Sequence, residues 1–393
     1  MIVVVVAVAL GAAWALGAFD RSSRPAAGQQ PSASPSAAPT AAGPVSFTTV
    51  PADGALEVNP ITVAEVAAVN AEIDSVTLRP AGGGEAVQGT LGEDGALWRA
   101  DGPLAFNTQY EMKVVLAGDD GSRVTETSSF ATVTPPNEAN AFMYPLDGAV
   151  VGVGQPIEIN FSEPVLNKDA VEAAISVDVS SGQEGAWHWV TDTKVRYRAA
   201  EFWAPYTTVK VDMQLFGVDF GNGMIGNFNE ERTFSTHNTR LAVVDNNTKT
   251  MQVFVDGQLT RTFPVTLGDA EWPSPEGYLV VMEQHRSVPF RAESIGLKPG
   301  DPAYYEPFDA TNASRLTHGG VFVHQALPGA MGALGVINVS HGCVGMSPEG
   351  AQYFMDTFDP GDVVQVLNTG FPPVPIGDGY GDWNTPWEQY AAG

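Results

Sequence analysis

Cysteine is almost absent from this chain of 393 residues, in which Cys343 is the only one. A single cysteine excludes an intramolecular disulfide, so the fold cannot depend on one. An unpaired thiol in an exported protein is a candidate reactive group, although a lone cysteine without supporting residues is more often a small buried hydrophobic one. We therefore expect any chemistry of the chain to centre on Cys343.

Basic residues are also scarce, because 19 Lys and Arg stand against 45 Asp and Glu, which gives a net charge of −26. Binding to nucleic acid needs clustered Lys and Arg side chains that neutralise phosphates. This composition therefore argues against a nucleic-acid partner. The simplest consequence of the net negative charge is a soluble protein whose surface repels other copies of the same protein.

Long hydrophobic runs are limited to one, the seventeen uncharged residues from Ile2 to Ala18. This length is at the short limit for a membrane-spanning helix and exceeds that of most signal-peptide cores. Both interpretations imply export to the cell envelope, with residues 1–19 as a membrane anchor or signal segment and as the only contact with a membrane. Because Arg21 and Arg24 follow the run and no basic residue precedes it, we expect the natural start upstream. Cleavage of the segment is left open.

Residues 20–44 are rich in Ala, Pro, Ser and Gln and contain few large apolar side chains. Such a composition cannot bury a core and is typical of an extended linker. We expect this linker to hold the rest of the chain away from the membrane.

Two similar modules are predicted at residues 45–135 and 136–238, because Pro51–Ala55 recurs as Pro145–Ala149. Short runs of alternating apolar and polar residues, such as Val209–Leu215, predict strands, and there is no cysteine pair to join them. This pattern predicts two immunoglobulin-like β-sandwiches. A role of one exposed tryptophan in stacking on carbohydrate stays open, but we expect the tryptophans of these modules mainly in their cores: Trp98, Trp187, Trp189 and Trp203.

Residues 239–369 are predicted to form a third, mainly β domain. Met251–Val255 ends at Asp256-Gly257, which favours a two-residue hairpin turn, and Asp362–Leu367 is predicted as the last strand. Ser347 followed by proline and glutamate predicts the start of a helix that ends near Phe358. The region from Phe290 to Thr317 lacks periodicity, so we expect a long loop or flap there.

The segment around the cysteine has the residues of a nucleophilic site. A histidine that accepts the thiol proton and remains as imidazolium would hold Cys343 as a thiolate, and His324 and His341 are the two candidates. The loop from Ala326 to Val339 contains three glycines and a proline, so a return of the chain from His324 to the cysteine is sterically easy. Gly342 lets backbone N–H groups approach a reacting carbonyl, as in an oxyanion hole.

These residues resemble the L,D-transpeptidase (YkuD-type) family of cysteine acyltransferases. The resemblance rests on His324, a glycine-rich spacer and the tetrapeptide Ser340–Cys343. Ser274–Tyr278 is similar to a strand entry of that family, and Gly381–Trp387 is similar to the tail of its long members, here residues 370–393. The resemblance implies a mainly β fold: two immunoglobulin-like sandwiches followed by a catalytic domain with a short helix after the nucleophile. It also implies a tail that packs near the second sandwich.

The resemblance implies that tetrapeptide stems of peptidoglycan are donor and acceptor. Cys343 would form a thioester, and His324, oriented by the backbone carbonyl of Gln325, would act as acid and base in making 3→3 cross-links. It also implies covalent inhibition by carbapenem-type β-lactams and no cofactor. Further residues would shape the pocket, the oxyanion hole and the substrate flap: Ser340, His341, Gly342, Tyr304 and Tyr305. Packing within the loop is an equal alternative for the two tyrosines.

One position departs from the family. Members frequently carry Arg or Asn two residues after the cysteine, where it can contact substrate, whereas this chain has Gly345. Substrate anchoring from that position is therefore not expected.

Several alternatives share the cysteine or the modules. Attack by water would make the enzyme an L,D-carboxypeptidase, and attack by a protein amine would make it a transferase that anchors proteins to the wall. A non-catalytic wall-binding protein is a rival of another class. In a papain-like protease the histidine follows the cysteine, which is not the order here.

Cys343 with His324 and His341 lacks the paired spacing of a metal site, so no metal site is expected. We expect surface or structural roles for the other histidines: His188, His237, His285 and His318.

Overall fold

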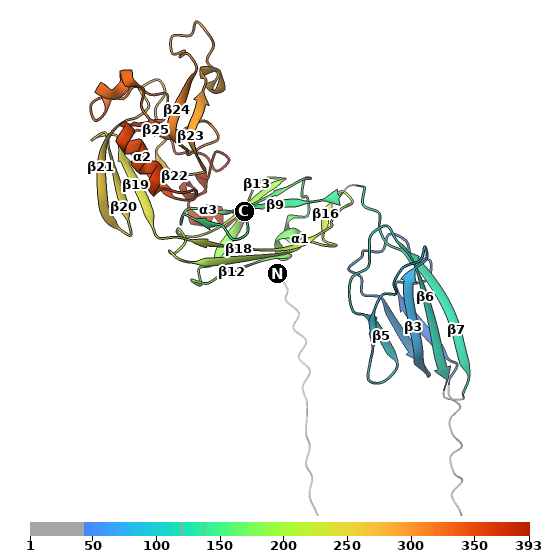
Figure 1. The fold of residues 1–393 in the computed structure, drawn as a ribbon. Coiled ribbons are helices and arrows are strands. Elements are labelled where there is room, and N and C mark those ends of the chain that lie inside the picture. Colours follow the sequence, from blue (N-terminus) through green and yellow to red (C-terminus); the bar gives the residue numbers. More distant parts are fainter. Residues whose placement is uncertain (1–42, 119–120, 137) are drawn as a thin grey trace, which may run out of the picture. The chain divides into compact units, whose positions relative to one another are not determined.

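The computed structural model describes residues 43–118, 121–136 and 138–393, and these residues are mainly β-structure, as predicted (Figure 1). The predicted anchor or signal segment at 1–19 and nearly all of the predicted linker lie outside the described residues. Within the described part, none of the helices has the length and apolar character needed to cross a bilayer.

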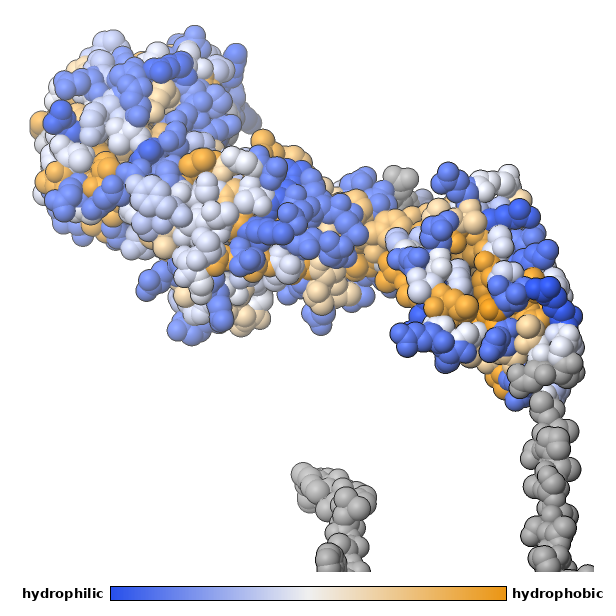
Figure 2. Space-filling view, turned by 60° about the horizontal axis from the view of Figure 1, so that its bottom comes forward, coloured by the Kyte–Doolittle hydropathy of each residue, from blue (hydrophilic) through white to orange (hydrophobic). Residues whose placement is uncertain are grey.

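The first module contains two sheets, with strand orders β1-β2-β5-β4 and β3-β6-β7. Alternation places Tyr110, Met112, Val114 and Leu116 of one strand inward, where they are buried. Figure 2 shows hydrophobic residues also gathered on the visible face of this module. Its strands are β1 (Ser46–Val50), β2 (Glu65–Val69), β3 (Ala71–Pro80), β4 (Gly89–Leu91), β5 (Leu97–Ala100), β6 (Gln109–Gly118) and β7 (Arg123–Ala131).

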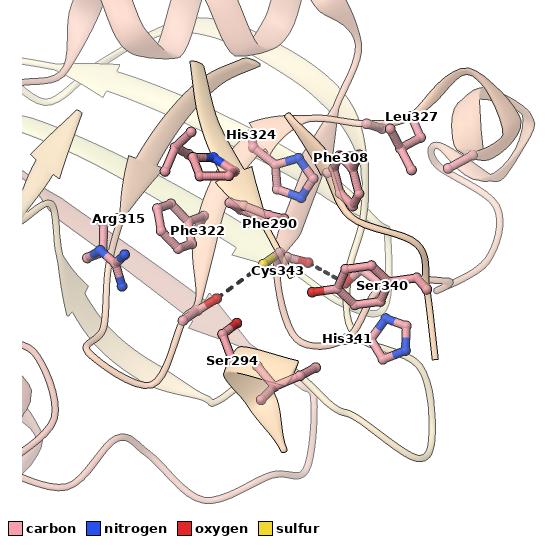
Figure 3. Close-up of a pocket in the computed structure, with 18 of the residues that line it drawn as sticks. Phe290, Ser294, Phe308, Arg315, Phe322, His324, Leu327, Ser340, His341 and Cys343 are labelled. Carbon is pink, nitrogen blue, oxygen red and sulfur yellow. Dashed lines mark hydrogen bonds between the residues drawn. The ribbon is translucent and has the colours of Figure 1, made fainter. Parts of the chain in front are cut away.

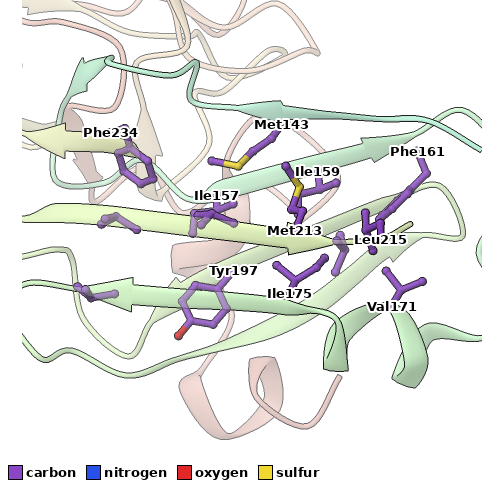
Figure 4. Packing of buried hydrophobic residues seen from close by; sticks show 14 of the residues in the cluster. Met143, Ile157, Ile159, Phe161, Val171, Ile175, Tyr197, Met213, Leu215 and Phe234 are labelled. Carbon is purple, nitrogen blue, oxygen red and sulfur yellow. The ribbon is translucent and has the colours of Figure 1, made fainter. Parts of the chain in front are cut away.

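The second module has two four-stranded sheets, β10-β18-β15-β12 and β13-β14-β11-β9, and a small sheet β16-β17-β8. Inward side chains of the two larger sheets, among them Ile157, Ile159 and Met213, form its core (Figure 4). The elements are β8 (Glu138–Ala139), β9 (Ala141–Tyr144), β10 (Val150–Val151), β11 (Ile157–Phe161), α1 (Lys168–Ala173), β12 (Ile175–Val179), β13 (Gly185–Thr191), β14 (Lys194–Ala199), β15 (Thr208–Gln214), β16 (Asp219–Gly221), β17 (Met224–Gly226) and β18 (Asn229–Thr236).

The predicted repeat between the modules is confirmed by matching hydrogen bonds. Asp53 Oδ1 accepts from the Ser129 N–H at 2.8 Å, and Asp147 Oδ1 accepts from the Thr233 N–H at the same distance. The glycine that follows each aspartate donates its N–H to the carbonyl of the same partner, at 2.7 Å in both modules. Trp98 and Trp203 are buried, as predicted, whereas Trp187 and Trp189 are only partly buried against the core.

The third domain is built on a nine-stranded sheet of order β22-β27-β19-β20-β21-β26-β25-β24-β23. The predicted hairpin is confirmed, because Asp256 and Gly257 have φ of 49° and 74° between two paired strands. The strands are β19 (Arg240–Asp245), β20 (Thr250–Val255), β21 (Gln258–Thr266), β22 (Gly277–Val280), β23 (Glu283–Phe290), β24 (Phe308–Arg315), β25 (Phe322–Gln325), β26 (Val344–Met346) and β27 (Val363–Leu367).

The helices of this domain and of the tail are short. Helix α2 (Pro348–Thr357) confirms the predicted helix, with the Ser347 side chain accepting from the Gly350 N–H at its start. The others are η1 (Ala292–Ile295), η2 (Pro328–Ala333), η3 (Gly381–Asn384) and α3 (Trp387–Tyr390).

The prediction of one long loop from Phe290 to Thr317 is wrong in its second half, because β24 covers Phe308–Arg315 and pairs with β23. The inward positions of this strand are the small residues Ala310, Ala313 and Ser314, so it lacks the bulky alternation that marks a strand in sequence. The irregular part is confined to residues 291–307, apart from η1.

The C-terminal tail packs against the second module, as predicted. The guanidinium of Arg196 on β14 donates to Asp382 Oδ2 at 2.7 Å and to the Ile376 carbonyl at 2.9 Å. The Trp383 indole N–H donates to the Gly154 carbonyl at 2.8 Å. Arg198 lies over the rings of Trp383, Trp387 and Tyr390. These contacts join the tail that follows the third domain to the second module.

Candidate active site

Neighbouring parallel strands bring the predicted pair of residues together. His324 lies on β25, and Cys343 directly precedes β26, whose Gly345 is the register partner of His324. Both strands are buried, with Val323 and Val344 in the domain core. The core therefore fixes the backbone positions of the histidine and the cysteine, although 18 residues separate them in sequence.

Both side chains line one cavity of about 440 Å³ (Figure 3). Its wall near the sulfur is aromatic, because Phe290, Phe308 and Phe322 pack around Cys343. Such a wall excludes water and strengthens electrostatic interactions within the cavity.

The Cys343 thiol is 8% exposed and donates to the carbonyl oxygen of Gly320, with 3.5 Å between sulfur and oxygen. Burial raises the pKa of the thiol to about 11, against the opposing effects of the Phe322 N–H and Arg315. The thiol is therefore neutral at rest. Burial thus opposes the expected resting pair of thiolate and imidazolium, because it disfavours a charged form.

His324 is held in a defined orientation. Its Nδ1 lies 2.8 Å from the Gln325 carbonyl, and its ring contacts Phe290 edge-on. Burial lowers the pKa of His324, which favours the neutral ring. Because Nδ1 must donate to the carbonyl, the neutral ring carries its lone pair on Nε2. His324 is thus prepared to accept a proton at Nε2.

The turn at Cys343 is fixed through hydrogen bonds to its carbonyl groups. Ser340 Oγ donates to the Cys343 carbonyl at 2.6 Å, and Ser274 Oγ donates to the Gly342 carbonyl at 2.8 Å. Gly342 has a φ of 106°, which favours glycine. Ser340 lines the cavity with Cys343, and Gly342 lines an adjoining groove beside Trp272 that shares Gly319 and His341 with the cavity.

His341 connects this turn to the loop 291–307. Its Nε2 is 3.0 Å from the Ala303 carbonyl, and its ring lies 5.3 Å from that of Tyr305. Tyr305 lines the cavity. The Tyr304 hydroxyl donates to the carboxylate of Glu293, which is a contact within the loop 291–307 and fits the alternative of packing within the loop.

Sequence reasoning missed part of the cavity wall. Arg315 and His318 line the cavity, although His318 was expected only at the surface or in a structural role. The aromatic residues at 290, 308 and 322 come from three strands, and no local motif joins them. Gly345 also lines the cavity. A residue with a side chain at this position would bring its Cβ to 2.9 Å from the Thr266 methyl group, so the neighbouring atoms would have to shift.

The tail contacts the loop next to Cys343. Asp378 Oδ1 accepts from the Gly319 N–H at 2.8 Å, one residue before the carbonyl that holds the thiol. Among the described residues, no group of three or more His, Cys, Asp or Glu side chains is arranged to hold a metal ion.

Comparisons with known proteins agree with this architecture. Residues 55–219 match the bacterial Ig domain, and residues 239–366 match the L,D-transpeptidase catalytic domain. L,D-transpeptidase 2 of Mycobacterium tuberculosis (strain CDC 1551 / Oshkosh) is 35% identical over 341 residues, which are 87% of this chain and 83% of the relative. L,D-transpeptidase 5 of the same species (strain ATCC 25618 / H37Rv) is 28% identical over 349 residues, which are 87% of this chain and 75% of the relative. The solved structure of the LD transpeptidase LdtMt1 in complex with imipenem is 30% identical, with a TM-score of 0.53, and covers 59% of this chain and 100% of its own.

Proposed function

Because the chain belongs to the L,D-transpeptidase family, we propose that it cross-links peptidoglycan stems through a thioester on Cys343, with His324 as acid and base. The observation that carries the proposal is the placement of a buried thiol and an oriented, neutral imidazole in one cavity. The remaining steps follow from the chemistry of these two groups.

Acylation would begin from the neutral pair. The Cys343 sulfur attacks the carbonyl carbon of the third residue of a tetrapeptide donor while His324 Nε2 takes the thiol proton. The carbon–nitrogen bond to the terminal D-alanine then breaks. His324 gives its proton to the leaving amine, so D-alanine departs and a thioester remains.

In deacylation the acceptor amine would be the attacking group, and the Cys343 sulfur would be the leaving group. The side-chain amine of a diamino acid on an acceptor stem attacks the thioester and gives a proton to His324. The carbon–sulfur bond breaks, the proton returns to sulfur, and a 3→3 cross-link is formed. The backbone N–H groups of Gly342 and Cys343 would stabilise the oxyanion in both steps, supported by the two serines that fix the turn.

The setting of the site supports further proposals. The imipenem complex of a relative supports carbapenems as covalent inhibitors that acylate Cys343. A substrate in the wall places the enzyme in the cell envelope, with residues 1–19 as an anchor or signal segment. The tandem immunoglobulin-like modules would position the catalytic domain within the wall.

A test of the function is the product formed from a disaccharide-tetrapeptide, followed by mass spectrometry. We expect loss of D-alanine together with a cross-linked dimer. Tripeptide without dimer would identify an L,D-carboxypeptidase, and dimer formed only with a protein amine would identify an anchoring transferase. If the folded protein yields no product, the proposal fails and a non-catalytic wall-binding role takes its place.

A further inference from the structure

The catalytic cavity differs in charge from the rest of the chain. The chain has a net charge of −26, yet among the described residues that line the cavity none is Asp or Glu. Arg315 is the one lining side chain of this set that is always charged. Because Glu283 pairs with this guanidinium, Arg315 acts on a ligand through short-range hydrogen bonds and not through long-range attraction.

Arg315 is held firmly at the end of β24. Its Nε donates to Glu283 Oε1 at 2.6 Å, and its Nη1 donates to the Thr317 carbonyl at 3.3 Å. The guanidinium carbon lies 4.4 Å from the centre of the Phe322 ring. The contacts with Glu283 and Thr317 use Nε and Nη1, so the donors on Nη2 are left for a ligand. A guanidinium fixed in this way loses little entropy when it binds.

Arg315 also acts on the reacting sulfur. Both residues line the same cavity, and the positive charge of Arg315 opposes the effect of burial on the pKa of Cys343. Figure 3 shows Arg315 beside Phe322 among the residues that line the cavity.

A tetrapeptide donor brings a carboxylate close to the attacked carbon. The terminal D-alanine is bound through its nitrogen to the scissile carbonyl, so standard bond lengths place its carboxylate carbon within about 4 Å of that carbonyl carbon. Gly345 offers no side chain to hold this group. A planar guanidinium is well suited to a carboxylate, which it binds by charge-assisted hydrogen bonds.

We propose that Arg315 binds the terminal carboxylate of the donor stem and thereby selects donors that end in a free acid. The assignment rests on the proposed transpeptidase function. Glu283 and Phe322 orient the guanidinium. Because D-alanine leaves after acylation, the anchor acts on the donor and not on the acceptor amine.

The test compares two donors, the disaccharide-tetrapeptide and the same compound with its terminal carboxylate amidated. Release of D-alanine or D-alanine amide is measured with the wild-type chain, Arg315→Gln and Arg315→Lys. A hydrogen bond to a charged group contributes enough binding energy for a change of about 10- to 100-fold. We expect the wild type to favour the free acid by this factor in kcat/KM. Arg315→Gln should lose the same factor for the acid and leave the amide unchanged, and Arg315→Lys should be intermediate.

Arg286→Gln is the matched control, because Arg286 is an exposed arginine of β23 that does not line the cavity. It should leave both donors unchanged. Equal turnover of acid and amide by the wild type would overturn the assignment, and so would an equal loss for both donors in Arg315→Gln, which marks a purely structural role. Release of neither product by the wild type would instead contradict the transpeptidase function, and the assignment with it.

Discussion

Replacing Cys343 by alanine is expected to lower the rate of cross-link formation by about 10⁴-fold or more, because the thioester then has no sulfur to form on. Cys343→Ser, which keeps the size of the side chain, should fall nearly as far, because a hydroxyl is a much weaker nucleophile without a strong base. His324→Ala removes the proton carrier and should cost about 10²- to 10⁴-fold. Dimer formation measured by mass spectrometry gives these rates.

The same variants test the cysteine in a second reaction. Wild-type protein incubated with imipenem should gain the mass of one drug molecule, and Cys343→Ala should gain none. Circular dichroism and thermal melting must show that each variant is folded. Cross-linking by folded Cys343→Ala at more than a few per cent of the wild-type rate would exclude the cysteine as nucleophile.

Asp382→Ala is expected to destabilise the chain by about 3 kcal/mol, because it leaves a buried cation without one of its partners. Asp382 is fully buried, and Arg196 is 1% exposed. The Arg196 guanidinium also pairs with Glu158 at 2.7 Å, so the loss should lie at the lower end of the range for a broken buried pair. Asp382→Asn keeps one acceptor oxygen and should cost less.

Chemical denaturation followed by tryptophan fluorescence measures this loss, because Trp383 lies in the same contact. Glu388→Ala is the matched control, since Glu388 is an exposed acid of the same tail. A surface change of this kind is expected to stay within about 0.5 kcal/mol. Equal stability of Asp382→Ala and the wild type would show that the Asp382–Arg196 pair does not stabilise the packing of the tail on the second module.

Local patterns in the sequence predicted the parts of the fold that depend on local chemistry. Ser347 with the proline after it predicted the start of α2, and Asp256-Gly257 predicted a hairpin turn, because caps and tight turns depend on neighbouring residues. The position of the site was predicted from the unpaired Cys343 and from a histidine on an apolar strand, because both features can also be recognised locally in the sequence. Strand β24 was missed, because its inward residues are small.

The rest of the site depends on contacts between distant segments. Arg315 lines the cavity because β24 pairs with β25, and no spacing in the sequence reveals that pairing. Tyr304 and Tyr305 are adjacent and chemically identical, yet Tyr305 lines the cavity whereas the Tyr304 hydroxyl donates to Glu293 within the loop. The protonation of the thiol also depends on its surroundings, since burial among aromatic rings decides it.

The acyl-enzyme is the species that tests the account most directly. The chain is mixed with a disaccharide-tetrapeptide whose side-chain amine on the third residue is acetylated, so that it can act as donor but not as acceptor. The reaction is quenched in acid, the intact mass of the protein is measured, and the protein is then digested for peptide mapping. We predict a gain equal to the donor minus D-alanine, located on the peptide that contains Cys343 and absent from Cys343→Ala. Release of D-alanine by the wild type without a covalent adduct, or with the adduct on another residue, would contradict catalysis by this thiol.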